Sequence, residues 1–470
     1  MAVTSLSAPP RTDGLTRAGL GTVLLGAALA PIDLFIVNVA LPTIGADLHA
    51  TAATLEWIVA GYGIAFAVLL VVGGRLGDAF GRRRLFLIGL AAFTVTSLAC
   101  GLAPDAGVLV GARMLQGAAA ALLVPQVLSI VQSATTGERR SRILGYYGAT
   151  GGIAMVIGLL AGGLLATADI AGTGWRMIFL VNVPIGLAGL ALGRRTLPET
   201  RAADPLSIDR WGTLLLGVTL LALLVPVLEG RALGWPAWCW VLLAVAPLAA
   251  VAFVAVERAR ESGGRATLLP MSLLAVPSLR RGLLLAVPFF AGVGGFMFVY
   301  ALTLQDGLAL SPLASGLALT PFAAAFLAAS LLSSRLVARH GIRLISIGAL
   351  VQALGLLVLI GAALLAWPDL NVVDLAPGTI LCGFGQGLSG PTLFRAVLSD
   401  VPHSSAGAGS GVLTTTQQSS LALGVAVLGT VFATVSAAAG IQVAVITVTA
   451  VQAVLVAAIA VGATRFTRAS

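Results

Sequence analysis

The chain has 470 residues, of which 58% are hydrophobic and 10% are charged, and its mean hydropathy is +1.03. A water-soluble protein carries roughly a quarter charged residues, so this composition excludes a soluble domain. The 27 basic residues outnumber the 18 acidic ones, the net charge is +9, and every basic residue is an arginine.

Continuous apolar stretches of about twenty residues recur along most of the chain, and each can cross a bilayer core of roughly 30 Å. Strands of a membrane barrel would instead alternate apolar and polar residues. The first residues contain Arg11 and no short apolar core with a cleavage site, so we expect no secretory signal peptide. We predict an all-α polytopic membrane protein. Its fourteen transmembrane helices are expected near 17–42, 53–73, 84–103, 106–133, 141–166, 175–193, 211–229, 237–257, 279–305, 313–334, 343–366, 373–399, 406–436 and 438–464.

The arginines are distributed unevenly between alternate loops of this arrangement. One side of the membrane would carry both termini and most of the arginines, whereas the loops on the other side carry only Arg176 and Arg231. By the positive-inside rule both termini are cytoplasmic, which requires an even number of helices. The basic charge therefore reflects membrane topology, and we expect no nucleic-acid partner.

Two short motifs recur in the second half of the chain. The segment GGRLGDAFGRRR (73–84) aligns with SSRLVARHGIR (333–343), and LQGAAAA (115–121) aligns with FGQGLSG (384–390). Both matches pair one predicted helix with the helix eight places later, which indicates an internal repeat of six helices separated by two inserted ones.

The repeat predicts the domain organisation. Two pseudo-symmetric bundles that face each other across a midplane cavity are the arrangement expected of an alternating-access transporter. The predicted parts are a cytoplasmic tail at 1–16, an N-terminal six-helix bundle at 17–193, a linker region with the two inserted transmembrane helices at 194–278, a C-terminal six-helix bundle at 279–464 and a cytoplasmic tail at 465–470.

Asp33 interrupts the first apolar stretch, PIDLFIVNVALP (31–42). It precedes Pro42 by nine residues, which places it about 13 Å from the outer end of the helix, near the midplane. An ionised aspartate there costs about 2.5–3.5 kcal/mol. A carboxyl group that alternates between wet and dry surroundings can bind and release a proton, because solvation changes its proton affinity. The alternative is a static, hydrogen-bonded aspartate that holds two helices together.

Arg113 is the expected partner of Asp33, because it lies about 12 Å from the outer end of its own helix. Gln116, Gly117 and Ala120 follow Arg113 on the same helical face, so this polar stripe should face the interior of the bundle. Proton binding to Asp33 would weaken the pairing with Arg113, and cargo could then compete for the carboxylate. A fixed buried ion pair remains the alternative.

Several motifs, in the same order along the chain, resemble those of the major facilitator superfamily. GRLGDAFGRRR is similar to the loop signature of that superfamily, and ARMLQGAAAA is similar to its fourth-helix signature R-x-L-Q-G. PIDLFIVNVALP and GWRMIFLVNVPIG (174–186) resemble stretches typical of its fourteen-helix drug:proton antiporters. The resemblance implies the major facilitator fold, proton-coupled export and a role for Arg113 in proton transfer.

The loop after the second predicted helix is a candidate cytoplasmic gate. Gly74 and Gly81 allow a tight turn and a close approach of helices. Asp78, with Arg82 and Arg83, can pair across the two bundles and with a helix N-terminus, and so hold the inner side closed while the outer side is open. The residue after Asp78 is alanine, where the superfamily has a basic residue. The alternative is a solvated run of charges that serves topology.

The fifth predicted helix contains a glycine-rich segment, GYYGATGGIAMVIGLLAGGLL (145–165). It resembles the signature that accompanies antiport in the superfamily, which implies that role for Gly145, Gly158, Gly162 and Gly163. Leucine follows Gly158 where the signature has proline. Ordinary packing of small residues is the alternative.

Seven residues are candidates to contact cargo in the central cavity: Trp57, Tyr62, Gln116, Phe296, Tyr300, Gln417 and Gln418. The aromatic ones could instead anchor at the membrane interface or fill the bundle core. Arg395 precedes Asp400 by five residues and is expected to extend to the cytoplasmic surface in a structural role.

The sequence predicts no cofactor and no metal site. A Walker loop requires lysine, and the three histidines and three cysteines are scattered. The proton gradient is then the expected energy source. We expect a proton-coupled exporter of small amphipathic compounds, such as antibiotics, drugs and dyes, in the plasma membrane of a bacterium. The alternative is a transporter of a single metabolite, either an importer or a dedicated exporter. No catalytic cluster or soluble domain points to an enzyme or to an obligate protein partner.

Overall fold

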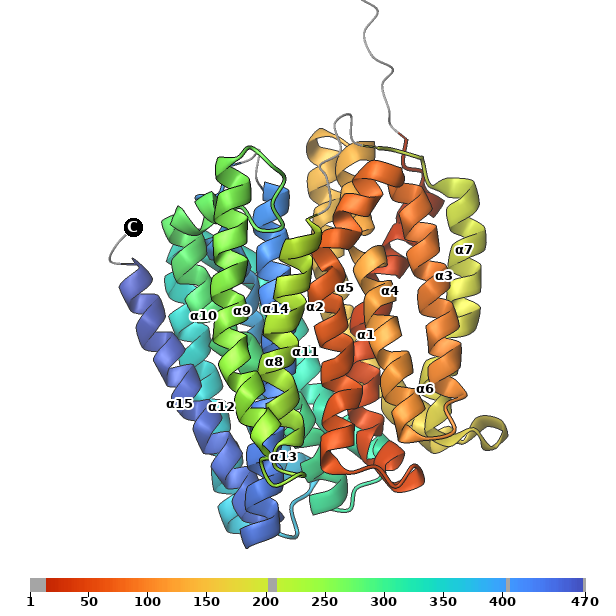
Figure 1. Ribbon diagram of the computed structural model, residues 1–470. Helices are drawn as coiled ribbons and strands as arrows, with labels where there is room; N and C mark the ends of the chain where they lie inside the picture. The colour runs from red at the N-terminus through yellow and green to blue at the C-terminus, as the bar shows by residue number, and fades with distance from the viewer. Residues whose placement is uncertain (1–13, 202–208, 403–405, 468–470) are drawn as a thin grey trace, which may run out of the picture.

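A computed structural model describes residues 14–201, 209–402 and 406–467, and every regular element within these ranges is helical. The N-terminal half (Figure 1) contains α1 (Arg17–Asp47), α2 (Ala52–Phe80), α3 (Arg82–Gly101), α4 (Ala106–Ala134), α5 (Gly137–Ala168), the short turns η1 (Ile170–Gly172) and η2 (Gly174–Arg176), α6 (Met177–Leu180) and α7 (Asn182–Thr196). The inserted helices are α8 (Arg210–Glu229) and α9 (Ala237–Ser262). The turn η3 (Met271–Ala275) leads into α10 (Pro277–Leu302), η4 (Thr303–Gly307), α11 (Pro312–His340), α12 (Arg343–Ala366), α13 (Val372–Leu398), α14 (Ala406–Ala439) and α15 (Ile441–Thr467).

The number of long helices agrees with the sequence prediction. Thirteen segments of the described chain are long and apolar enough to cross a membrane, and one of them, Gly174–Thr196, joins η2, α6 and α7. The helix outside this set is α13, whose hydropathy is lowered by its glycines and by Asp374, Gln386 and Arg395. Because α13 packs between α11 and α12, we count it as the fourteenth.

Several predicted helix ends were wrong. The first helix was expected to end at Pro42 but continues to Asp47, and the second was expected to end at residue 73 but continues to Phe80. Hydropathy marks the apolar core of the membrane, whereas backbone hydrogen bonding carries a helix beyond it. The second helix ends where Gly81 adopts a φ of 109°, a conformation that residues with a side chain rarely adopt.

The same packing pairs occur in the two halves, as the internal repeat predicts. In the first half α4 packs on α2 and α3, and α5 packs on α1; in the second half α13 packs on α11 and α12, and α14 packs on α10. Between the halves, α5 packs on α11 and α14 packs on α2. Figure 1 shows the two groups of helices side by side, with α8 and α9 running along the second group beside its junction with the first.

Glycines in the two repeated motifs allow the backbones to approach closely. A Cβ atom at Gly117 on α4 would collide with the carbonyl oxygen of Tyr62 on α2. A Cβ atom at Gly387 on α13 would collide with the carbonyl oxygen of Phe326 on α11. In a membrane the hydrophobic effect does not favour contact between helices, because lipid tails are equally apolar. Small residues instead stabilise the contact by allowing close van der Waals packing. Packing therefore explains the glycine of the repeated Gln-Gly pair.

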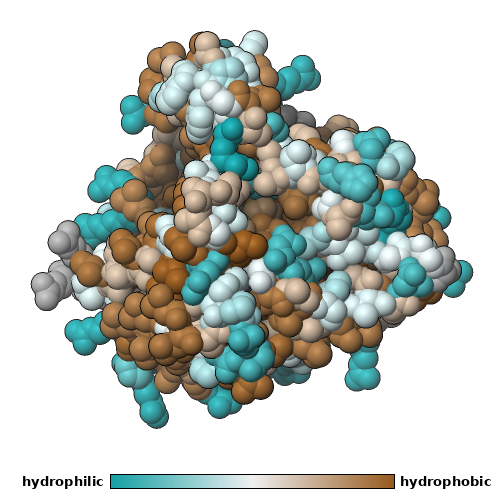
Figure 2. Space-filling view, turned by 90° about the horizontal axis from the view of Figure 1, so that it is seen from below, coloured by the Kyte–Doolittle hydropathy of each residue, from teal (hydrophilic) through white to brown (hydrophobic). Residues whose placement is uncertain are grey.

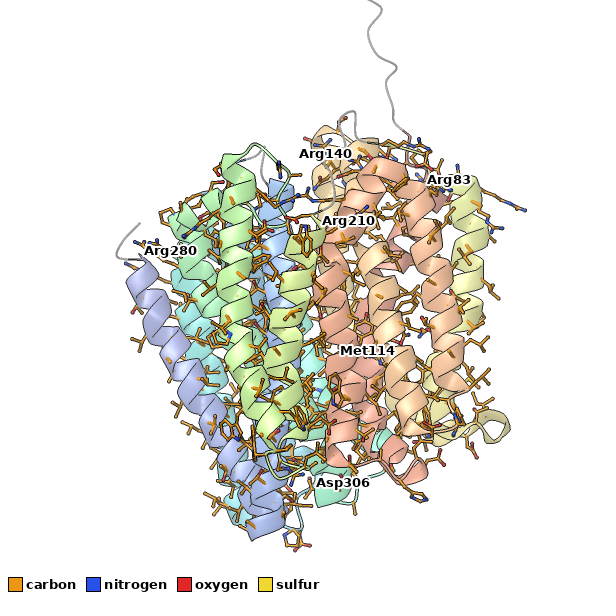
Figure 3. All side chains as sticks on the ribbon, in the orientation of Figure 1. Arg83, Met114, Arg140, Arg210, Arg280 and Asp306 are labelled. Atoms are coloured by element: carbon orange, nitrogen blue, oxygen red, sulfur yellow. The ribbon has the colours of Figure 1, made fainter. Side chains whose placement is uncertain are left out.

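The two ends of the molecule differ in charge. Arg83, Arg140, Arg210 and Arg280 lie at one end (Figure 3), which we call the arginine-rich end, whereas Asp306 lies at the opposite end. Figure 2 shows that opposite end face, where patches of hydrophilic residues lie among hydrophobic ones. The structure thus has the polarity that the distribution of arginines in the sequence predicts.

Candidate functional site

A buried ion pair lies inside the N-terminal half. The guanidinium of Arg113 on α4 donates to a carboxylate oxygen of Asp33 on α1, and both side chains are completely buried. The contact between the two residues, predicted from their equal depth, is confirmed. A buried pair of this kind is costly to break, because removal of one partner leaves the other charge without compensation.

Three further polar side chains surround the carboxylate. The amide nitrogen of Gln116 donates to Asp33 Oδ1 at 2.8 Å and also lies 2.8 Å from the hydroxyl of Ser97 on α3. The amide nitrogen of Asn182 on α7 lies 3.3 Å from the same carboxylate oxygen. Four helices therefore meet at Asp33. Sequence reasoning missed Ser97 and Asn182, although Asn182 stood out as a polar residue within the apolar motif GWRMIFLVNVPIG.

Arg113 also faces α2. Its Nε donates to the carbonyl oxygen of Ile58 at 3.1 Å, and the guanidinium lies over the ring of Tyr62, 4.4 Å from the ring centroid. Such a cation–π contact contributes up to about 2 kcal/mol when it is desolvated. Tyr62 thus lies between the ion pair and the space on the other side of its ring, which is the central cavity.

A cavity of about 540 Å³ lies on that other side. Its wall is formed by α1, α2, α4 and α5 of the first half and by α10, α11, α13 and α14 of the second. Six phenylalanines contribute to the lining: Phe35, Phe66, Phe289, Phe290, Phe326 and Phe394. Its polar groups include the side chains of Asn38, Tyr62, Gln386, Gln417 and Gln418. A mostly apolar, aromatic cavity with a few polar groups is typical of a site for small amphipathic molecules.

Of the seven predicted cargo contacts, three line the cavity, namely Tyr62, Gln417 and Gln418. The other four, Trp57, Gln116, Phe296 and Tyr300, lie elsewhere. Trp57 donates to the carboxylate of Glu229 at 2.7 Å and so contacts inserted helix α8. Gln116 belongs to the ion-pair network. Sequence alone could not separate these positions, because apolar residues occur on all sides of α2 and α4, so the pattern does not show which side faces the cavity.

Phe296 and Tyr300 lie in the core of the C-terminal half. Their rings stack with centroids 5.1 Å apart, and Phe296 also stacks on Phe322 at 5.5 Å. The aromatic residues of α10 that do face the cavity are Phe289 and Phe290, about two helical turns nearer to the arginine-rich end.

Gln386 is a cavity residue whose role the sequence analysis missed. It is the counterpart of Gln116 in the internal repeat, but the position equivalent to Arg113 is Gly383, so the second half has no matching ion pair there. Gln386 is buried, and neither atom of its amide group has a hydrogen-bond partner among the described residues. A buried amide without partners is costly unless a ligand or water pairs with it.

The cavity extends toward the arginine-rich end, where Phe394 and Arg395 form part of its wall. Arg395, expected to be purely structural, is therefore also a cavity residue. At the opposite end the two halves are in contact. Gln305 donates to the carbonyl oxygen of Val39 at 2.5 Å, and the amide of Leu313 donates to the hydroxyl of Thr167 at 3.1 Å. The structure is closed at this opposite end.

Asp33 itself does not line the cavity. Its side chain has no exposed surface, and Tyr62 separates Arg113 from the cavity. In this conformation, with the ion pair formed, a molecule in the cavity reaches Tyr62 before it reaches Asp33. Competition of cargo for the carboxylate after the pair has weakened stays a prediction.

The candidate gate residues gather at the arginine-rich end. Arg82 and Asp78 form an ion pair at 2.8 Å, and the side chain of Arg83 donates to the carbonyl oxygen of Arg194. Gly81 occupies its turn, and Gly74 faces the side of Pro125, with a Cβ atom at 74 expected 3.6 Å from it. Within the described ranges, these contacts stay in the N-terminal half and the segment after α7. Pairing across the two bundles is not seen in this conformation, in which the cavity reaches this end.

The glycines of the antiport-like motif face two different helices. A Cβ atom at Gly158 or Gly162 would lie within 2.9 Å of backbone atoms of α1, near Ile32 and Ile36. A Cβ atom at Gly163 would lie 2.7 Å from the carbonyl oxygen of Pro312 on α11, in the other half of the molecule. Gly145 lies on the same helix, but its surroundings fall outside the described part of the chain. The described glycines bring α5 close to both α1 and α11.

Replacing Gly163 with valine is expected to slow export about tenfold, because the added side chain separates α5 from Pro312 and disfavours the conformation that is closed at this end. The measurement is the rate of cargo export in proteoliposomes. Gly111→Val is the matched control, since no atom lies within 4 Å of a Cβ there. A wild-type rate for Gly163→Val would refute a role for this contact in closure.

Comparisons with known proteins place the chain in a family. The sequence pattern of the Major Facilitator Superfamily matches residues 23–425. The probable actinorhodin transporter of Streptomyces coelicolor is 38% identical over 88% of this chain and 72% of its own length. The puromycin resistance protein pur8 of Streptomyces alboniger is 36% identical over 88% of this chain and 81% of its own length. The cephamycin export protein CmcT of Amycolatopsis lactamdurans is 36% identical over 91% of this chain and 88% of its own length.

Solved structures share the fold. A crystal structure of the peptide transporter POT in complex with sulfate superposes with a TM-score of 0.71 at 16% identity and covers 97% of both chains. A D-xylose-proton symporter superposes with a TM-score of 0.65 at 16% identity, covering 93% of this chain and 96% of the symporter. At this identity the likeness concerns the fold alone. From its family pattern, its curated relatives and its fold, the chain is a multi-pass membrane protein that belongs to the major facilitator superfamily.

Proposed function

We propose that the protein exports small amphipathic compounds, including antibiotics, in exchange for protons. The observation that carries this proposal is the buried Asp33–Arg113 pair, separated by the ring of Tyr62 from an aromatic cavity of about 540 Å³. The carboxyl group of Asp33 can bind either a proton or the guanidinium of Arg113. The cavity can hold a molecule with a flat apolar body and a few polar groups.

The relatives support the class of cargo. They are named for the transport of actinorhodin, resistance to puromycin and export of cephamycin. These names cover compounds of different structure. A cavity lined by phenylalanines and three glutamines can accommodate cargo of different shapes, because apolar contacts have little directional preference. We therefore propose a broad range of cargo rather than one metabolite.

The arginine-rich end is the cytoplasmic end in this proposal, and both termini are cytoplasmic. The structure, with its cavity reaching that end and its ion pair formed, then corresponds to the proton-free state that receives cargo from the cell. The plasma membrane of a bacterium supplies the required inward proton gradient. No catalytic chemistry, cofactor, metal or protein partner enters the cycle.

Coupling would pass through Arg113 and Tyr62. Protonation of Asp33 removes the negative charge that holds Arg113, so the guanidinium moves relative to the Tyr62 ring that faces the cavity. Cargo that binds against Tyr62 changes the same contact from the other side. Each ligand then alters the affinity for the other by the same factor, as linkage requires.

A transport panel tests the proposed function. Purified protein in proteoliposomes is assayed with puromycin, a β-lactam, a polycyclic dye and an amino acid, each alone and in pairs, under an imposed proton gradient. We expect export of several chemically unlike compounds with mutual inhibition, because all of them occupy one cavity. Transport of a single compound that no other compound inhibits would favour a dedicated metabolite transporter and overturn the proposal.

A further inference from the structure

Arg395 is the one charged side chain among the described residues that line the central cavity. No aspartate or glutamate belongs to this described wall, and its other polar side chains are uncharged amides and hydroxyls. Arg395 also forms no ion pair with any described acidic residue. The described wall of the cavity therefore carries one positive charge that no side chain compensates.

Arg395 lies far from the buried ion pair in depth. It is 23 residues after the first residue of α13, or about 35 Å along the helix, whereas Arg113 is seven residues after the first residue of α4, or about 10 Å. Both helices run toward the arginine-rich end, since α4 leads to Arg140 and α13 ends beside the start of α10. This separation exceeds the Debye length of about 8 Å, so a charge bound at Arg395 does not act directly on the ion pair.

A row of phenylalanine rings leads from Arg395 into the cavity. Phe394 precedes Arg395 on α13, and its ring meets that of Phe290 on α10 edge to face, with centroids 5.8 Å apart. Phe290 meets Phe289 in the same way at 5.1 Å. All three rings line the cavity, so they offer stacking and edge contacts to a planar molecule.

Gln386 lies beyond the other end of this row. A Cβ atom at Gly390 would lie 3.6 Å from the ring of Phe289, and Gln386 is one helical turn further from Arg395 on the same helix. Arg395 and Gln386 are thus about 14 Å apart along α13. Neither amide atom of Gln386 has a partner among the described residues, so the amide can both donate to and accept from a ligand.

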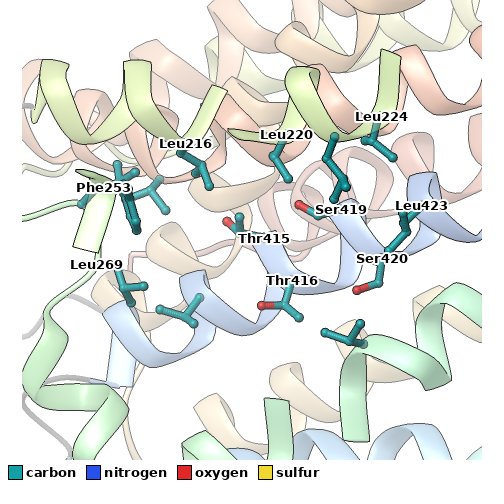
Figure 4. Close-up of a pocket in the computed structure, with 15 residues that line it drawn as sticks. Leu216, Leu220, Leu224, Phe253, Leu269, Thr415, Thr416, Ser419, Ser420 and Leu423 are labelled. Carbon is teal, nitrogen blue, oxygen red and sulfur yellow. The ribbon is translucent and has the colours of Figure 1, made fainter. Parts of the chain in front are cut away.

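A second pocket, of about 270 Å³, lacks this charge. It lies between the inserted helices and α14, and Figure 4 shows leucines of α8 facing hydroxyl-bearing residues of α14 across it. Every described residue of its wall is uncharged. A charged ligand therefore finds a counter-charge in the wall of the central cavity and none in the described wall of this pocket.

We propose that the central cavity selects planar amphipathic anions over cations of similar shape, and that Arg395 determines this preference. The carboxylate or phenolate of the cargo pairs with the guanidinium of Arg395, whose planar fork suits such oxygens. The ring system lies along Phe394, Phe290 and Phe289, and a polar group at its far edge meets the amide of Gln386. Between apolar walls the ion pair is stronger than on an open surface.

This inference rests on the proposed export function and names the charge class of its preferred cargo. Neutral and cationic compounds still enter the cavity, but they bind without the contribution of Arg395, and a cation near the guanidinium is repelled by it.

The test compares two dyes that share a planar xanthene ring system. Fluorescein is an anion at neutral pH, and tetramethylrosamine is a cation. Binding of each dye to the purified protein in detergent is measured by fluorescence polarisation. We expect wild type to bind fluorescein about tenfold more tightly than tetramethylrosamine. Arg395→Gln is expected to weaken fluorescein binding about tenfold and not to weaken tetramethylrosamine binding, which also shows that the variant is folded.

Arg280→Gln is the matched control, because Arg280 lies at the same end of the molecule (Figure 3) but outside the described wall of the cavity. It removes the same charge and is expected to change neither affinity. Gln386→Leu is expected to weaken fluorescein binding about threefold, because the oxygen at the edge of the dye loses a hydrogen-bond partner.

Three results would overturn the anion site. They are equal weakening of both dyes by Arg395→Gln, unchanged fluorescein affinity in Arg395→Gln or Gln386→Leu, and weakening of fluorescein by Arg280→Gln as large as that by Arg395→Gln. Each of them leaves the proposed export standing, because the transport panel tests export separately. A wild-type protein that exports no compound of that panel would overturn export and leave the dye preference, measured in detergent, unaffected.

Discussion

Replacing Asp33 with asparagine is expected to abolish export against a concentration gradient, with a loss of about a hundredfold or more. The amide has the shape of the carboxyl group and can accept the hydrogen bonds of Gln116 and Asn182, but it neither binds nor releases a proton. Without that exchange, nothing links the proton gradient to the change between the inward- and outward-facing states. Cargo binding in the central cavity is expected to persist, because Asp33 does not line it.

The measurement is gradient-driven accumulation of puromycin in inside-out vesicles, together with puromycin binding to the purified variant. Asp105→Asn is the matched control. Asp105 caps the N-terminus of α4 and accepts a hydrogen bond from the amide of Val108 at 2.9 Å, and asparagine caps a helix equally well. Loss of accumulation in both variants would mean that losing any carboxylate impairs the protein. It would contradict a specific role for Asp33 in proton coupling.

Replacing Arg113 with methionine is expected to destabilise the protein by about 3–5 kcal/mol, because the carboxylate of Asp33 is left buried without a cation. Restoring charge balance with Asp33→Asn in the same chain is expected to recover most of that loss. The double variant then has no buried charge, and methionine fills much of the volume of the arginine side chain. Neither variant is expected to couple protons to export.

Thermal unfolding in detergent, monitored for wild type, both single variants and the double variant, measures this coupling between the two residues. A double variant that is less stable than Arg113→Met alone would mean that the ion pair contributes little. The stability of the site would then come from the hydrogen bond of Arg113 to Ile58 and from its contact with Tyr62.

Sequence was sufficient for the features that the membrane imposes. Fourteen helices, the polarity of the two ends and the internal repeat follow from segment length, arginine position and motif spacing, because the bilayer constrains each of these directly. The pairing of Asp33 with Arg113 followed from depth alone, since few charged groups occur near the midplane and each needs a partner.

Sequence was insufficient for deciding which face of a helix lines the cavity. Phe289 and Phe296 lie on the same helix, in equally apolar surroundings, yet only Phe289 faces the cavity. Buried helices of a membrane protein are hydrophobic on all sides, so the amphipathic pattern that orients a helix in a soluble protein is weak. Gln386 and Ser97 were missed for a related reason, because their significance depends on neighbours in other helices.

Proton release on cargo binding tests the central claim most directly. Purified wild-type protein and Asp33→Asn are mixed with puromycin in weakly buffered detergent solution, and the change in pH is recorded. We predict that wild type, brought to its protonated form before puromycin is added, releases up to about one proton per puromycin bound, because cargo favours the proton-free state, and that Asp33→Asn binds puromycin and releases none. Equal proton release from both proteins would contradict the account and move the proton site to another buried carboxyl group, with Glu56 on α2 the first to examine.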